Sequence, residues 1–138
     1  MLRLSVLAAG SAENVAAPLV LGVTVLTSLD DAAVAEIGWP QGAAGTALAL
    51  ARLAWEAGLD GVVASAREAP LLREALGGGA VIVTPGIRAA GAAVQDQART
   101  STPREALAAG ADYLVVGRPV IASPDPAGAL RGLREEAR

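Results

Sequence analysis

Residues 80–88 read AVIVTPGIR, an apolar run that stops at a proline, a glycine and an arginine. A short apolar run bounded by turn residues is typical of a strand buried in a sheet, and we expect this strand to span residues 80–84. Residues 113–120, YLVVGRPV, have the same order: an apolar run over 113–116, then Gly117 and Arg118. Two such strands predict an α/β fold with an arginine just past the end of each.

Three further apolar runs complete the expected sheet, at residues 2–7, 19–26 and 61–65. None of the five runs alternates cleanly between apolar and polar residues, which favours parallel strands covered on both faces. Helical patterns over residues 42–58 and 66–76 lie between strands. Strands alternating with helices at this spacing predict right-handed βαβ units in one domain spanning residues 1–138.

The beginnings of the helices carry recognisable capping signals. Ser65 with Glu68, and Thr102 with Glu105, both fit the capping box, in which a hydroxyl and a carboxylate three residues apart satisfy backbone N–H groups. Pro126 directly after Asp125 is a further expected helix start, because proline is tolerated at the first helical position. These signals predict helices beginning near residues 66, 103 and 126.

Composition excludes several classes of function. The net charge is −3, with 11 basic and 14 acidic residues, so no basic surface is expected for nucleic acid. No stretch offers about 18 consecutive apolar residues, so we expect no membrane span and a cytoplasmic location. The sequence contains no cysteine and no histidine, which removes thiol chemistry and the commonest metal ligand. All 11 basic residues are arginine, and there is no lysine.

Arg88 and Arg118 are the first candidate site residues. In parallel α/β folds the carboxyl ends of the strands form the site, and two guanidinium groups there could bind a phosphate dianion. Gly86 and Gly117 would let backbone N–H groups approach the ligand, and the helix that begins near Asp125 could add its positive dipole end. The irregular stretch 86–101 has the length of a functional lid. The alternative is that both arginines are solvated charges.

Five segments in order resemble the bacterial orotidine 5′-monophosphate decarboxylase family. They are VTVLTSLD (23–30), DGVVASA (60–66), VTPGIR (83–88), DQARTSTPREALAAGADYLVVGRPV (96–120) and the Asp125-Pro126 pair. The resemblance extends from residue 19 to the C-terminus and, more weakly, to the first strand. A sister decarboxylase acts on 3-keto-L-gulonate 6-phosphate, but TPGIR is more similar to the orotidylate branch.

The resemblance implies a (β/α)₈ barrel, of which this chain would hold about five parallel βα units and lack the first three strands. It implies decarboxylation of orotidylate to UMP without a metal or organic cofactor. The phosphate-binding residues would be Arg88, Gln97, Gly117 and Arg118, with Gln97 on a lid over the nucleotide. Thr27 and Ser28 would contact the pyrimidine. Their alternative role is to cap the helix that follows Asp30.

One departure from the family is decisive for catalysis. The family's decarboxylation residues are an aspartate, a lysine and an Asp-x-Lys-x-x-Asp motif, and this sequence contains no such motif and no lysine. Arginine is a poor replacement for the proton-donating ammonium, because it does not release its proton near neutral pH. We therefore expect no catalytic residues in this chain and no activity from it alone.

Three hypotheses follow. The chain is a truncated or split orotidylate decarboxylase that binds orotidylate or UMP-like nucleotides, and its exposed sheet requires a homo-oligomer or a missing N-terminal half. Alternatively, it is a non-catalytic half-barrel that binds phosphorylated nucleotides or assembles with a partner. The third possibility is a structural domain whose arginines are solvated.

Overall fold

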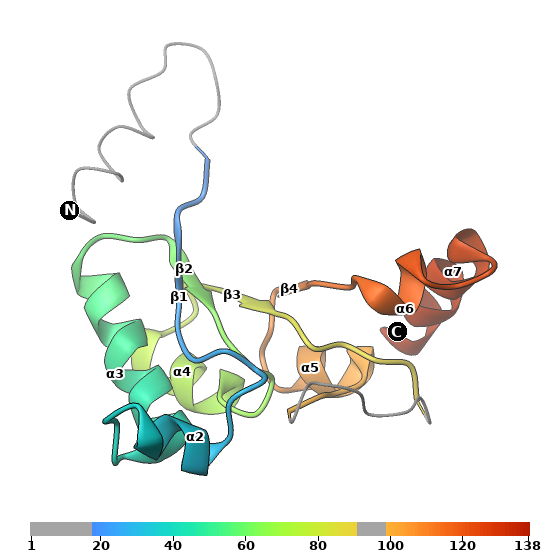
Figure 1. Ribbon diagram of the computed structural model, residues 1–138. Coiled ribbons are helices and arrows are strands. Elements are labelled where there is room, and N and C mark those ends of the chain that lie inside the picture. The colour runs from blue at the N-terminus through green and yellow to red at the C-terminus, as the bar shows by residue number, and fades with distance from the viewer. Residues whose placement is uncertain (1–17, 91–98) are drawn as a thin grey trace.

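A computed structural model describes residues 18–90 and 99–138, and these contain a four-stranded parallel sheet (Figure 1). The strands are β1 (Leu21–Val23), β2 (Gly61–Val63), β3 (Val81–Thr84) and β4 (Tyr113–Leu114). They pair in chain order, each parallel to the next. The predicted α/β class and four of the five predicted strands are confirmed, although each strand is shorter than expected. The fifth, at residues 2–7, lies outside the described residues.

Helices follow the strands as the alternating pattern predicts. Their bounds are α2 (Asp31–Glu36), α3 (Gly42–Glu56), α4 (Ala69–Leu76), α5 (Pro103–Ala108), α6 (Arg118–Ile121) and α7 (Pro126–Glu136). Figure 1 shows α3, α4 and α5 on one side of the sheet, with α6 and α7 together beyond the end of β4. Every helix in the described part of the chain is too short or too polar to span a lipid bilayer.

The helix-start signals have different outcomes. The capping box at Thr102 is confirmed: its hydroxyl accepts the Glu105 N–H at 3.3 Å, and the Glu105 carboxylate accepts the Thr102 N–H at 2.8 Å. The Thr102 backbone N–H, and after it the Thr102 side chain, lower the pKa of the Glu105 carboxyl. The capping box at Ser65 is wrong, because α4 begins only at Ala69 and the Glu68 side chain makes no cap hydrogen bond. Its carboxylate instead pairs with a buried arginine that is distant in sequence.

The face of the sheet under the helices forms the main core. Val62 on β2 and Ile82 on β3 are 1% and 0% exposed, and pack with alanine and leucine side chains of α3 and α4. Gly61 lies where β2 passes close to β3: a Cβ atom there would be 1.9 Å from the carbonyl oxygen of Val81. Only glycine fits this position, so the close approach of the two strands depends on it.

The opposite face of the sheet carries a row of apolar side chains in register: Val23, Val63, Val83 and Tyr113. The outer two, Val23 and Tyr113, are 62% and 59% exposed, and the inner two are partly buried. The expectation that both faces are covered is therefore wrong for the described residues. An apolar row of this kind lies inside a closed barrel, where strands from the other side of the barrel cover it.

Candidate functional site

The carboxyl ends of the four strands lie at one edge of the sheet, because all four strands are parallel. The segments that follow them carry most of the predicted site residues: Thr27 and Ser28 after β1, Arg88 after β3, and Gly117 and Arg118 after β4. Pairing continues past the ends of the strands, since the Val115 N–H donates to the Thr84 carbonyl at 2.9 Å. Residues from adjacent strands therefore share this edge.

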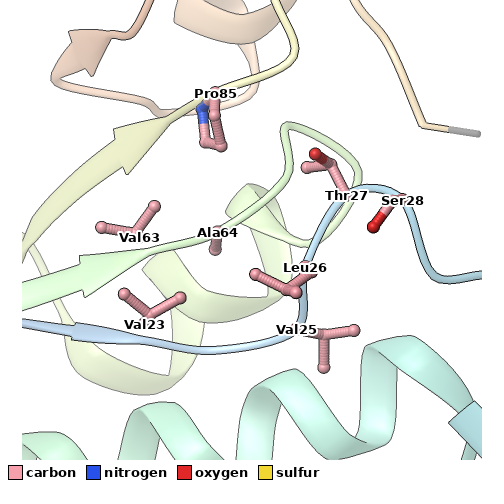
Figure 2. Close-up of a pocket in the computed structure, with 8 residues that line it drawn as sticks. All are labelled: Val23, Val25, Leu26, Thr27, Ser28, Val63, Ala64 and Pro85. Atoms are coloured by element: carbon pink, nitrogen blue, oxygen red, sulfur yellow. The ribbon is translucent and has the colours of Figure 1, made fainter. Parts of the chain in front are cut away.

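A pocket of about 320 Å³ opens at this edge between the first three strands (Figure 2). Figure 2 shows the side chains of Thr27 and Ser28 at one end of the pocket and those of Val23 and Val63 at the other. The remaining lining residues are Val25, Leu26, Ala64 and Pro85. An apolar slot with two hydroxyl groups at one end suits a flat, partly polar ring, because ligand sites combine apolar walls with few polar groups.

Thr27 and Ser28 are not needed to cap helix α2. Asp30 does so, since its carboxylate accepts the Ala33 N–H at 2.9 Å. The alternative capping role for the two hydroxyl residues is therefore wrong. Thr27 is buried at 8% exposed and Ser28 is exposed, and both line the pocket.

Arg88 is held by its backbone and by one arm of its side chain. Its N–H donates to the Ser101 carbonyl at 3.0 Å, and the Ser101 N–H donates to the Gly86 carbonyl at 3.3 Å. Gly86 has a φ of +80°, a conformation that favours glycine. The Arg88 Nη1 donates to the Ile87 carbonyl at 2.9 Å, whereas Nη2 is buried and has no hydrogen-bond partner among the described residues. A buried donor of this kind calls for an acceptor.

Gly117 and Arg118 begin the short helix α6, where Gly117 is the N-cap residue and Arg118 the first helical residue. Both are exposed. Gln97, the predicted lid residue, lies outside the described residues. Helix α7 begins at Pro126 as expected, and the Asp125 carboxylate caps its N-terminus by accepting the Gly128 N–H at 2.9 Å; the dipole contribution of this helix to an anion site stays a prediction. The described residues contain no cluster of three or more acidic groups that could hold a metal ion.

Sequence reasoning missed a buried ion pair beside the pocket. Arg99 Nη1 donates to Glu68 Oε1 at 2.5 Å, and the two side chains are 5% and 4% exposed. Arg99 Nη2 also donates to the Leu26 carbonyl at 2.9 Å. Both residues lie within or beside segments that carry the family resemblance, but the spacing of Glu68 from Ser65 predicts a capping residue. Local sequence gave no signal for this pair, because the two residues are 31 positions apart.

Comparisons with known proteins agree with this fold. The sequence model of the "Orotidine 5'-phosphate decarboxylase / HUMPS family" matches residues 4–133. An orotidine 5′-phosphate decarboxylase of Nitrosococcus oceani is 56% identical over 119 residues, which are 86% of this chain and 51% of that protein. The Moorella thermoacetica protein of the same name is 52% identical over 127 residues, 91% of this chain and 50% of that protein.

A solved structure shows the same relationship. The crystal structure of orotidine 5′-phosphate decarboxylase from Lactobacillus acidophilus matches with a TM-score of 0.80 and 33% identity, covering 100% of this chain and 58% of that one. The protein is thus an α/β chain with the fold of part of a (β/α)₈ barrel. It belongs to the orotidine 5′-phosphate decarboxylase / HUMPS family. It spans about half the length of the curated relatives it matches.

Proposed function

We propose that this chain is the substrate-holding portion of an orotidine 5′-phosphate decarboxylase, and that it binds orotidylate or UMP but does not decarboxylate orotidylate alone. Its relatives carry the name of that enzyme at 50–56% identity, while the chain spans only about half of their length. In this enzyme we expect the residues of this chain to bind the nucleotide. They do not include the groups that break the bond to the carboxylate.

The pyrimidine ring would lie in the pocket after β1, β2 and β3. Val63 and Pro85 offer apolar contact to the faces of the ring, and the hydroxyl groups of Thr27 and Ser28 can donate to or accept from its polar edge. Hydroxyl groups suit this role because a pyrimidine edge presents both N–H donors and carbonyl acceptors. Orientation of the base would therefore come from the loop after β1.

The phosphate would bind between Arg88 and the Gly117–Arg118 segment, with Gln97 as a further ligand. The observation that carries this assignment is the buried Nη2 of Arg88, which has no partner among the described residues and lies at the site edge of the sheet. A phosphate oxygen would satisfy that donor with a charge-assisted hydrogen bond. Arg118 follows the neighbouring strand and can supply a second guanidinium group.

Decarboxylation breaks the bond from C6 of the pyrimidine to the carboxylate and leaves the electron pair on C6, which must then take a proton. An ammonium group can donate that proton, but this chain contains no lysine. A guanidinium group does not give up its proton near neutral pH. We therefore expect binding without turnover.

Calorimetry with UMP tests the phosphate assignment. Arg118→Ala should weaken binding by about 1.5–3 kcal/mol, the usual cost of one charge-assisted hydrogen bond. Arg131→Ala is the matched control, because Arg131 lies on α7 with a side chain 68% exposed. Equal affinities for the two variants would contradict the assignment.

Complementation tests the missing catalytic half. When a polypeptide with the Asp-x-Lys-x-x-Asp motif is mixed with this chain, decarboxylation should be restored. The measurement is the fall in orotidylate absorbance. If the two chains fold together and the mixture still does not decarboxylate orotidylate, the split-enzyme hypothesis is ruled out.

The second candidate is a non-catalytic half-barrel that assembles with a partner. The observation favouring it is the apolar row Val23, Val63, Val83 and Tyr113 on the open face of the sheet. Exposed apolar patches of this kind mark interaction surfaces. Isolation of a stable complex with no decarboxylase activity would favour this second candidate.

A further inference from the structure

We propose that Arg99 is a positioning residue: paired with Glu68, it fixes the loop after β1 so that Thr27 and Ser28 face the base of the nucleotide. This inference rests on the proposed function, because it assumes that a nucleotide base occupies the pocket after β1. It adds to that function the residue that determines where the base-contacting groups lie.

The contacts of Arg99 divide between two elements. Nη1 donates to Glu68 Oε1, at the beginning of α4, while Nη2 donates to the carbonyl oxygens of Val25 and Leu26 at 3.4 and 2.9 Å. Arginine can serve both elements at once because its guanidinium group is a rigid planar fork with five N–H donors. The side chain therefore bridges the start of α4 and the loop after β1.

The two carbonyl groups come directly before Thr27 and Ser28. The Leu26 carbonyl also accepts the Leu29 N–H at 3.0 Å, which closes a turn across Thr27 and Ser28. Leu26, Thr27 and Ser28 all line the pocket. Arg99 thus holds the first residue of the turn that presents both hydroxyl groups to the pocket.

Stability alone is a weak reason for this arrangement. A buried ion pair must offset the desolvation of both charges, and well-packed apolar residues of similar size often give equal or greater stability. Here both partners are at least nine-tenths buried, and Glu68 Oε2 and Arg99 Nε have no hydrogen-bond partner among the described residues. What an apolar pair could not supply is the pair of donors to the loop carbonyls.

The geometry also predicts that Arg99 acts mainly on the base end of the ligand. Arg99 contacts the loop that carries Thr27 and Ser28, whereas two of the proposed phosphate ligands, Arg88 and Arg118, follow β3 and β4. Changes at Arg99 should therefore weaken recognition of the base more than recognition of the phosphate. Ribose 5-phosphate has the sugar and phosphate without the base, which makes it the matched ligand for UMP.

Calorimetry of the full chain with both ligands tests this. Arg99→Lys keeps the charge beside Glu68 but loses the fork, so UMP affinity should fall about tenfold while ribose 5-phosphate affinity stays within about twofold. A second variant, Glu68→Leu with Arg99→Met, replaces the pair by apolar residues of similar size. It should show the same changes in affinity for UMP and ribose 5-phosphate. Arg73→Lys is the control, because Arg73 likewise joins a carboxylate and backbone carbonyls, away from the pocket. Equal loss for both ligands would make Arg99 merely structural and overturn the proposal.

Amide hydrogen exchange provides a readout without ligand. The Leu29 amide, bonded to the Leu26 carbonyl, should exchange about tenfold faster in Arg99→Lys and in the double variant, and at the wild-type rate in Arg73→Lys. An unchanged Leu29 rate in both Arg99 variants would overturn the proposal. If the wild-type chain binds neither UMP nor ribose 5-phosphate, the proposed function fails, and the exchange rates still decide whether Arg99 fixes the loop.

Discussion

Arg73 on α4 lies 2.7 Å from the Asp112 carboxylate, and this ion pair joins the amino-terminal ends of β3 and β4. The Asp112 carboxylate also accepts the Ile82 N–H at 2.8 Å, while Arg73 donates to the Ala80 and Gly110 carbonyls at 2.6 and 2.8 Å. The pocket and the predicted phosphate ligands lie at the opposite, carboxyl ends of the strands. We therefore expect the Arg73–Asp112 edge to contribute to stability and the opposite edge to binding, the division that parallel (β/α)₈ barrels show.

Asp112→Asn should lower the melting temperature at pH 7. It should also reduce the loss of stability that occurs as the pH falls. Burial alone would raise the pKa of Asp112, but the Ile82 N–H and Arg73 outweigh it, so the pKa is lowered overall. A lowered carboxyl pKa stabilises the fold above the ordinary value near 4, and this contribution is lost as pH falls through the folded pKa. Melting curves by circular dichroism between about pH 7 and 2 measure it.

The control for Asp112 is Glu74→Gln, since Glu74 is exposed on the same helix as Arg73. The difference in melting temperature between wild type and Asp112→Asn should shrink as the pH falls. A difference that stays constant down to the lowest pH would show that the carboxylate charge does not contribute.

Gly61→Ala should destabilise the fold by about 1–3 kcal/mol or more, because the new Cβ would press on the Val81 backbone and separate β2 from β3. Gly132→Ala is the control. Nothing lies within 4 Å of a Cβ at Gly132, which is inside α7, so alanine should stabilise that helix by about 0.5–1 kcal/mol. Denaturant unfolding of both variants measures the two effects, which should have opposite signs.

Arg88→Met should separate binding from stability. The substitution removes the buried Nη2 donor that lacks a partner, but it also removes the Nη1 hydrogen bond to the Ile87 carbonyl, so the free energy of unfolding should change by no more than about 1 kcal/mol. UMP affinity should nevertheless fall about tenfold, since one charge-assisted hydrogen bond is lost. Arg52→Met, at an exposed position on α3, should change neither quantity. A large loss of stability in Arg88→Met would show that the arginine holds the fold.

Val23→Lys combined with Tyr113→Lys should reduce self-association of the chain. The two side chains lie at the ends of the apolar row across the open face and are 62% and 59% exposed, so charges there cost little stability. Ile121→Lys is the control: Ile121 is 75% exposed but lies on α6, outside the row. Sedimentation velocity measures the change, and equal behaviour of both variants would mean that the row is not the contact surface.

The order of strands and helices could be predicted from the sequence because those signals are local. An apolar run such as residues 80–84 needs only its own residues and the turn after it to indicate a strand. The capping box at Thr102 joins residues three apart, so its hydrogen bonds form wherever that helix forms. The same local signals predict the positions of Gly86 and Arg88 after β3, and of Gly117 and Arg118 after β4.

Tertiary structure alone decided the role of Glu68. Its spacing from Ser65 fits a capping box as well as Thr102 and Glu105 do, yet its carboxylate pairs with Arg99, 31 residues away. An arginine buried beside the loop carbonyls needs a counter-charge, and that requirement outweighs a local cap hydrogen bond. Which carboxylate supplies it depends on the path of the chain from Glu68 through α4 and β3 to Arg99. Local spacing carries no information about that path.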